Sequence, residues 1–178
     1  AATIGANITG SFVQNTDAAA TTTVDGGANV SGGLDIDTGT LTVSAALTGD
    51  VDVAAGASYD QNNGLTGTLT TAGGADIDGD ITGNLISSGT TTLAGNVSGT
   101  VAQSAGSVTV DGTSTLTGAV TISGGSFTAS AQTTLGAGLS NDGTLDINAA
   151  VLGGQTLTNT KAATIGANIT GSFVQNTD

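Results

Sequence analysis

An acidic run is the part of this sequence whose residue types and spacing are best suited to chemistry. Asp76, Asp78 and Asp80 are each separated by a single residue. Alternate residues of a β-strand point to the same side, so on a strand these carboxylates would share one face and, with carbonyl oxygens from a turn, coordinate Ca²⁺. The alternative, which we favour, is that the Asp side chains face water and keep an otherwise neutral chain soluble. Similar pairs are Asp35 with Asp37 and Asp50 with Asp52.

Few other side chains in the sequence are suited to catalysis. The fourteen acidic residues are all Asp, Lys161 is the one cation, and there is no Arg, His, Glu or Cys. Lyases need a basic side chain to remove a proton, and glycoside hydrolases need one protonated carboxyl beside a carboxylate. We therefore predict that the protein is not an enzyme and uses no cofactor, with calcium as the one candidate ion.

Charge and hydropathy argue against two classes of partner. The formal net charge is −13 at pH 7, whereas binding to a phosphate backbone depends on Lys and Arg that displace its counterions. No apolar run approaches the roughly 18 residues of a membrane span. We therefore predict no nucleic-acid partner and no membrane span in this segment.

One segment occurs twice without a change. Residues 1–17, AATIGANITGSFVQNTD, are identical to residues 162–178, so that position 162 repeats position 1. The simplest explanation is a tandem array in which residues 1–161 form one unit and residues 162–178 begin the next. In the alternative, the identical segments are exchanged between subunits.

A shorter pattern recurs inside the unit: apolar, any residue, Gly or Ala, any residue, a second apolar residue that we call the anchor, and then Thr or Ser. The anchors are Ile8, Val30, Val51, Leu69, Ile81, Val97, Val120, Leu139, Leu157 and Ile169. Inward-facing residues at every second position are typical of strands and not of helices. The pattern predicts an all-β, parallel β-solenoid with eight or nine coils per repeat unit.

Asn comes directly before the anchor in several copies of the pattern. These residues are Asn7, Asn29, Asn96 and Asn168. Asn side chains at equivalent positions of stacked strands can form hydrogen bonds along the stacking axis. We therefore expect the Asn side chains and the anchors to form a structural ladder along the rod.

Tracts of alternating Thr suggest a second function. They lie at residues 21–23, 38–42, 66–70, 113–117 and 156–160. A flat, regular array of Thr hydroxyls can order water and bind ice, but Thr is also a good outward-facing strand residue whose hydroxyls pair along the sheet. Because the tracts are unevenly placed relative to the anchors, we do not expect one flat face. Binding of ice or of another surface ligand remains the alternative function.

The few aromatic residues have two expected locations. Phe12, Phe127 and Phe173 are predicted to fill the core. Tyr59 belongs to the segment ASYDQNNG, whose turn-forming residues predict a loop that protrudes from the rod.

Two segments, GSVTVDGTSTLTGAVTISGGS at residues 106–126 and SNDGTLDI at residues 140–147, combine Gly or Asn turns with strands of the type Thr-Leu-x-Val or Ile. In this the chain resembles the β-helical passenger regions of bacterial autotransporters and filamentous-haemagglutinin-type adhesins. The resemblance implies a right-handed parallel β-helix exported to the surface of a Gram-negative bacterium. We therefore expect an extracellular structural protein, such as a filament, sheath, matrix component or adhesin stalk. We expect its partners to be identical units, end to end, and neighbouring fibres or a surface.

Overall fold

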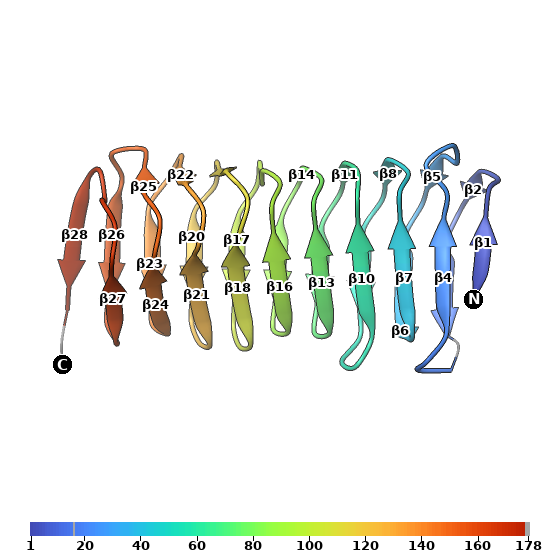
Figure 1. Cartoon of the computed structure of the whole chain (residues 1–178), viewed down its shortest axis with the longest axis horizontal. Coiled ribbons are helices and arrows are strands. Elements are labelled where there is room, and N and C mark those ends of the chain that lie inside the picture. Colours follow the sequence, from blue (N-terminus) through green and yellow to red (C-terminus); the bar gives the residue numbers. More distant parts are fainter. Residues whose placement is uncertain (16, 177–178) are drawn as a thin grey trace.

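The computed structural model describes residues 1–15 and 17–176, and every regular element in them is a β-strand. The chain winds as a parallel β-solenoid of ten coils with roughly 18 residues in each coil. The coils lie side by side along a straight rod, and the two ends of the chain lie at opposite ends of that rod (Figure 1). The predicted fold class is therefore confirmed.

The coils form three faces, which we call sheets A, B and C in the order in which each coil passes through them. Sheet A consists of β1 (Ala2–Ile4), β4 (Thr21–Val24), β7 (Thr40–Val43), β10 (Ser58–Gln61), β13 (Gly74–Ile77), β16 (Thr90–Leu93), β18 (Ser107–Val110), β21 (Ser126–Ala129), β24 (Thr144–Ile147) and β27 (Ala163–Ile165). Sheet C consists of β3 (Phe12–Asn15), β6 (Leu34–Thr38), β9 (Val51–Val53), β12 (Leu69–Thr71), β15 (Leu85–Ser87), β17 (Val101–Gln103), β20 (Val120–Ile122), β23 (Leu139–Asn141), β26 (Thr156–Asn159) and β28 (Ser172–Gln175).

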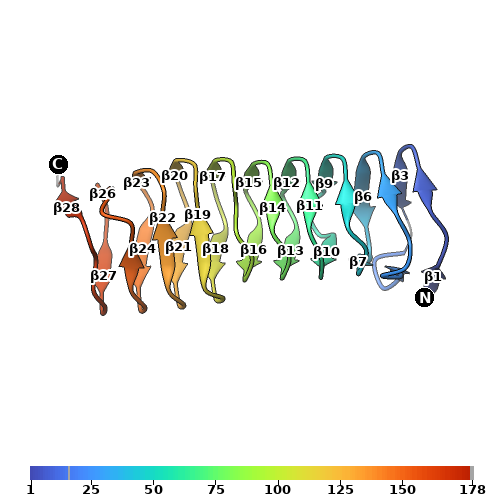
Figure 2. The same ribbon diagram turned by 90° about the horizontal axis from the view of Figure 1, so that it is seen from above.

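Sheet B is made of shorter strands and is less continuous. Its strands are β2 (Ile8–Thr9), β5 (Val30–Ser31), β8 (Leu47–Thr48), β11 (Leu65–Thr66), β14 (Ile81–Thr82), β19 (Ser114–Leu116), β22 (Thr133–Leu135) and β25 (Val151–Leu152). Val97 joins its two parts through single parallel bridges to Ile81 and Leu116. Seen from above, the coils follow one another in a regular succession along the whole rod (Figure 2).

After nine coils, equivalent residues of the sequence repeat lie at the same positions in the sheets. In sheet A, a continuous series of paired residues leads from Ala2 in the first strand to Ala163 in the tenth. In sheet C, a second series leads from Phe12 to Phe173. In the sequence repeat, Ala163 is the counterpart of Ala2 and Phe173 is the counterpart of Phe12. One repeat is therefore nine whole coils, the upper of the two predicted numbers, and the tenth coil repeats the first.

The core is one continuous cluster of mostly aliphatic side chains that runs along the inside of the rod. It forms because alternate residues of each strand point inward, and each coil contributes one strand to each face. Val, Leu and Ile supply most of it. Phe127 is 1% exposed, as predicted. Tyr59 is also buried, since it lies on β10 and points inward, so the loop expected at this place is a strand. Stacked coils thereby remove from water an apolar face that one coil cannot cover by itself.

A column of glycines occupies the corner between sheets B and C in the first seven coils. Its members are Gly10, Gly32, Gly49, Gly67, Gly83, Gly99 and Gly118. A Cβ atom on Gly67, whose φ is +152°, would lie 2.2 Å from the carbonyl oxygen of Gly49 in the preceding coil. At Gly67 the corner therefore requires a residue without a side chain, both for its backbone angle and for the close approach of the neighbouring coil.

Candidate functional site

The acidic run of residues 76–80 is divided between two faces of the rod. Asp76 lies on β13 of sheet A, whereas Asp80 directly precedes β14 of sheet B, and the chain turns a corner between them. The expected arrangement on one strand face therefore does not occur. Asp80 instead bonds to the next coil, because its Oδ1 accepts hydrogen bonds from the backbone N–H of Asn96 at 2.8 Å and from its Nδ2 at 2.9 Å. Among residues 1–15 and 17–176, no three acidic side chains are grouped to hold a metal ion.

Asp76 has a different carboxylate as its neighbour. It pairs in register with Asp60 on β10, and like charges directly opposite each other on a sheet are unfavourable. Burial, with the nearby charges of Asp78, Asp60 and Asp111, raises the pKa of Asp76 above its ordinary value. Gly74 has no side chain to fill the adjoining surface, and a hollow of about 300 Å³ lies there, lined also by Thr40 and Thr90 among others.

A second acidic pair lies on sheet C. Asp35 and Asp52 are register partners on β6 and β9. With Asp50 and Gly33 they line a hollow of about 360 Å³. The two hollows thus lie on different faces, and each is lined by carboxylates without a cationic side chain.

Sheet A carries two regular outward columns of mostly hydroxyl side chains. The first column is Thr3, Thr23, Thr42, Asp60, Asp76, Thr92, Thr109, Thr128, Asp146 and Thr164. The second, two residues earlier on each strand, is Thr21, Thr40, Ser58, Gly74, Thr90, Ser107, Ser126 and Thr144. The Thr tracts are spread over several sheets, but this face nevertheless forms an ordered array that was not predicted from the sequence. Three Asp residues interrupt it.

The predicted anchors do not form one ladder. Ile8, Val30, Ile81 and Val97 occupy a column in sheet B, together with Leu47 and Leu65. Val51, Val120 and Leu139 occupy a column in sheet C, together with Leu69 and Leu157. Ile169 reaches sheet B through a bridge to Val151. The reason is that the same local pattern of alternating apolar residues serves both faces.

Two of the predicted Asn side chains, Asn7 and Asn96, bond along the axis to the backbone of the next coil. Asn7 Oδ1 accepts a hydrogen bond from the Asn29 backbone N–H at 2.9 Å, and Asn96 Oδ1 accepts one from that of Thr115 at 2.7 Å. The carbonyl oxygen of Asn168 accepts the Val151 N–H at 2.9 Å. These bonds give polar groups just ahead of the sheet B strands a partner in the adjacent coil, which helps to hold the stacking.

A column of buried polar side chains on sheet C was not predicted. It includes Gln14, Thr71, Ser87, Gln103, Asn141 and Asn159, all 2% exposed or less. Several members donate to the carbonyl oxygen two residues ahead, as Thr71 does to Gly73 at 3.3 Å and Asn141 does to Gly143 at 2.7 Å. The signal in the sequence was a polar residue two positions after the sheet C apolar residue in most coils, with Ile36, Val53 and Ile122 as exceptions. These side chains fasten the turn from sheet C to sheet A.

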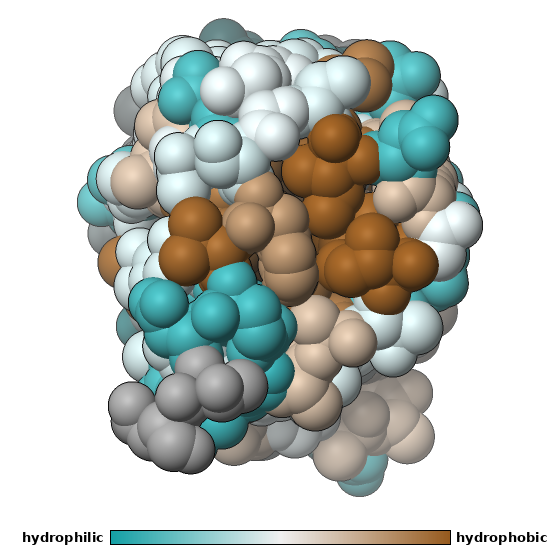
Figure 3. Space-filling model, turned by 90° about the vertical axis from the view of Figure 1, so that its left-hand side faces the viewer, coloured by the Kyte–Doolittle hydropathy of each residue, from teal (hydrophilic) through white to brown (hydrophobic). Residues whose placement is uncertain are grey.

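The last coil exposes the apolar interior at the end of the rod. Ile165 and Phe173, which occupy core positions, are 41% and 39% exposed. Figure 3 shows apolar residues gathered near the centre of this end face, with polar residues around them. Ile4, Ile8 and Phe12 of the first coil are likewise only partly buried. Both end faces therefore present surface that another coil would cover.

The part of the chain that the structure describes contains no helix long and apolar enough to cross a bilayer. No protein family, curated protein or solved structure shows significant similarity to this chain.

Proposed function

We propose that this chain is a segment of an extracellular, fibre-forming repeat protein whose function is structural, as in a filament, sheath, matrix or adhesin stalk. The observation that carries the proposal is that the repeat unit makes a whole number of coils, nine. Equivalent residues of successive units therefore lie in the same columns of sheets A and C. A repeat with a fractional number of coils would rotate each unit relative to the last. With nine whole coils, the contact between two units is of the same kind as the contact between coils inside a unit, so the rod continues straight.

The mechanism is stacking of identical coils. The second coil pairs β4 with β1 and β6 with β3. Because β27 and β28 have the sequences of β1 and of most of β3, a following copy of the second coil would meet the same partners on the tenth. Main-chain hydrogen bonds and apolar contacts of the kind already present would then cover the exposed end face. An open sheet edge, which in most proteins favours aggregation, here propagates the fibre.

The composition supports a rod that assembles along its axis and not sideways. Net charge of −13 on 178 residues makes the sides of parallel rods repel each other. The export to a bacterial surface, the contacts with neighbouring fibres or a surface, and the right-handed winding follow from the resemblance and stay predictions. The proposed role requires no catalytic group, cofactor or nucleic acid.

Native material provides the test. The intact denatured polypeptide is sized by gel electrophoresis and mass spectrometry, and cells are labelled with an antibody raised against the 178-residue chain. The proposal predicts a chain many times heavier than 16.7 kDa and label along filaments outside the cell. A chain near that mass, or label confined to the cell interior, would contradict it.

A second candidate function, binding of ice or another regular surface, is favoured by the hydroxyl columns of sheet A. Hydroxyl groups about 4.8 Å apart across strands and about 6.6 Å apart along a strand form a lattice that can order water. The test measures thermal hysteresis and ice-crystal shape with the wild-type chain, with Thr109→Lys on sheet A, and with Thr66→Lys on sheet B as the matched control. The candidate requires activity that only Thr109→Lys removes, and an inactive wild-type chain would eliminate it.

A further inference from the structure

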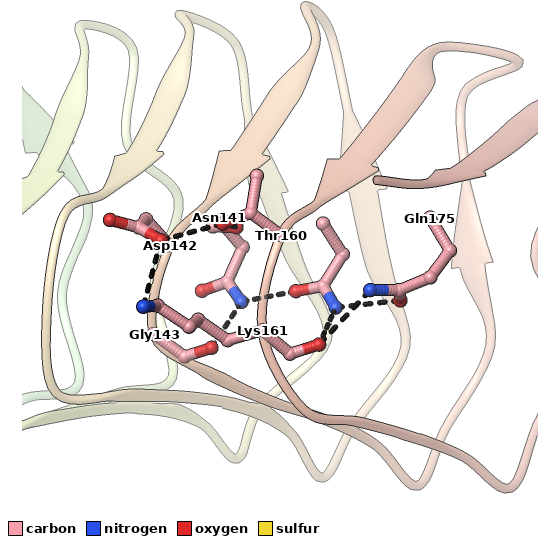
Figure 4. A network of polar contacts seen from close by, with 7 residues as sticks. Asn141, Asp142, Gly143, Thr160, Lys161 and Gln175 are labelled. Atoms are coloured by element: carbon pink, nitrogen blue, oxygen red, sulfur yellow. Dashed lines mark hydrogen bonds and ion pairs between the residues drawn. The ribbon is translucent and has the colours of Figure 1, made fainter. Parts of the chain in front are cut away.

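Three amide side chains, two of them buried, form a ladder along sheet C at the C-terminal end of the rod (Figure 4). Asn141 Nδ2 donates a hydrogen bond to Asn159 Oδ1 in the next coil. Asn159 Nδ2 donates to Gln175 Oε1 in the coil after that, at 2.8 Å. The side chains come from β23, β26 and β28, which are register neighbours. The ladder therefore links three successive coils through side chains alone.

Each amide in the ladder also donates to a backbone carbonyl oxygen, which for Asn141 and Asn159 lies in the turn that follows their own strand. Asn141 donates to the carbonyl oxygen of Gly143 at 2.7 Å, and Asn159 donates to that of Lys161 at 2.6 Å. Gln175 Nε2 donates to the same Lys161 oxygen at 3.1 Å. Asn159 is 0% exposed, so water cannot replace a lost partner. These bonds fix the direction in which Asn159 presents its amide to the next coil.

The ladder crosses the boundary between two sequence units. Asn159 belongs to the ninth coil, the last of one unit, and Gln175 is the counterpart of Gln14 in the first coil of the next. Ile122 precedes Asn141 in this column, and Ile36 follows Gln14, the counterpart of Gln175, in the first copy of the segment. Within this column, the contact between units is therefore made by the hydrogen bond between the Asn159 and Gln175 side chains.

We propose that Asn159 fixes the register in which the end of a unit accepts the first coil of the next unit, and that it excludes coils with an apolar residue at this position. This inference rests on the proposed function and adds its partner specificity. At the same position the second, third and seventh coils offer Ile36, Val53 and Ile122, which cannot accept a hydrogen bond. A first coil that slips by two residues would place Phe173 opposite Asn159. Either mismatch leaves a buried amide without its partner, which is strongly unfavourable.

Disulfide trapping in the 178-residue chain tests the register, and the natural chain has no Cys to interfere. Thr158 and Val174 are outward-facing register partners on β26 and β28, so the double variant Thr158→Cys with Val174→Cys reports the native register. Thr158→Cys with Ser172→Cys reports a slip of two residues, because in the native register these Cα atoms are about 8 Å apart, too far for a disulfide. Yields of the two cross-links are compared under mild oxidation.

Substitutions at position 159 are then combined with each pair. Asn159→Leu is expected to raise the ratio of slipped to native cross-link by roughly tenfold or more, since an unpaired buried amide no longer opposes the slip. Asn159→Gln, which keeps an amide, is expected to restore most of the native ratio. Thr71→Val is the matched control, because it removes a buried polar group of the same column in the fourth coil, away from the joint.

A native ratio that stays within twofold in Asn159→Leu, or that shifts equally in Thr71→Val, overturns the inference. If Asn159→Leu does not fold, as judged by circular dichroism, Asn159→Ser takes its place, because its short side chain cannot reach Gln175. The mass of the native polypeptide plays no part in this readout. Failure of the fibre proposal and failure of the register proposal are therefore separate results.

Discussion

Substitution of Gly67 by Ala is predicted to destabilise the solenoid by about 2–6 kcal/mol, from two contributions. A non-glycine residue at the Gly67 φ of +152° is strained by about 1–3 kcal/mol. The added Cβ would also lie 2.2 Å from the Gly49 carbonyl oxygen and 2.6 Å from its carbon, where 3.4 Å or more is an ordinary contact. The clash is with backbone and not with a side chain that can rotate away.

Relief of that clash requires the third and fourth coils to separate by about 1 Å at this corner, well beyond the tolerance of packed interiors. The backbone hydrogen bonds from Gly49 N–H to Thr66 and from Val51 N–H to Thr68, both 2.9 Å long, span the same gap. Weakening them adds about 1–3 kcal/mol of unmet hydrogen bonding. The estimate for Gly67→Ala is the sum of this effect and the backbone strain.

Two control substitutions separate the contributions in urea unfolding measurements. Gly56 has a φ of +86° but no atom within 4 Å of an added Cβ. The free energy of unfolding of Gly56→Ala should therefore fall only by the backbone strain, about 1–3 kcal/mol. Gly27 has neither constraint, so Gly27→Ala should lie within about 1 kcal/mol of wild type. Hydrogen exchange at the Gly49 and Val51 amides should rise in Gly67→Ala alone. If Gly67→Ala is as stable as Gly27→Ala, the close stacking of the coils at this corner is refuted.

Three further predictions follow from single side chains. Phe127→Ala, at a position 1% exposed, should lower the free energy of unfolding by about 3–5 kcal/mol, measured in urea, whereas Phe173→Ala should lower it less; equal losses would contradict the placement of the core. Burial, and to a lesser extent the charge of Asp60, raises the pKa of Tyr59, so the folded state keeps a proton that the unfolded chain releases above about pH 10. The free energy of unfolding should therefore fall by about 1.4 kcal/mol per pH unit above that pH. The same fall in Tyr59→Phe would refute this origin. The raised pKa of Asp76 means that its ionised form is disfavoured in the folded state. Asp76→Thr should therefore stabilise the protein at neutral pH, by an amount that decreases as the pH falls and Asp76 takes up a proton. A difference in the free energy of unfolding that does not depend on pH would contradict this prediction.

The fold was predictable because alternation and repetition are local and visible in the sequence. Residues alternating inward and outward indicate strands, and an exact repeat without long loops indicates stacked coils. The assignment of each strand to a face was not predictable. Ile8 on sheet B and Val51 on sheet C have the same local pattern, and the twelve residues from Leu69 to Ile81 lead from sheet C of one coil to sheet B of the next.

The hydroxyl columns of sheet A were missed because the turn that precedes this sheet varies in length. Ten residues separate Phe12 from Thr22, but only six separate Leu69 from Ala75, although each pair occupies the same two columns. A count of residues from one apolar position therefore loses the alignment. Only pairing with the neighbouring coils restores it.

Tyr59 and the amide ladder show why the remaining features needed the structure. The segment around Tyr59 is rich in turn-forming residues, yet Ser58–Gln61 aligns with Thr40–Val43 and Gly74–Ile77 and becomes a strand between them. Asn141, Asn159 and Gln175 are polar residues that propensity places on the surface. They are buried or meet one another only because successive coils stack them at one position, a non-local condition.

The central claim, that one repeat is nine coils of a continuous rod, is tested most directly by the length of the rod as a function of the number of repeats. Polypeptides with one, two and three complete repeat units are compared by electron microscopy and small-angle X-ray scattering. We expect straight rods of constant width that lengthen by about 43 Å per added unit, from nine coils about 4.8 Å apart. An increment that differs from this by more than one coil, or rods that bend at each unit boundary, would contradict it.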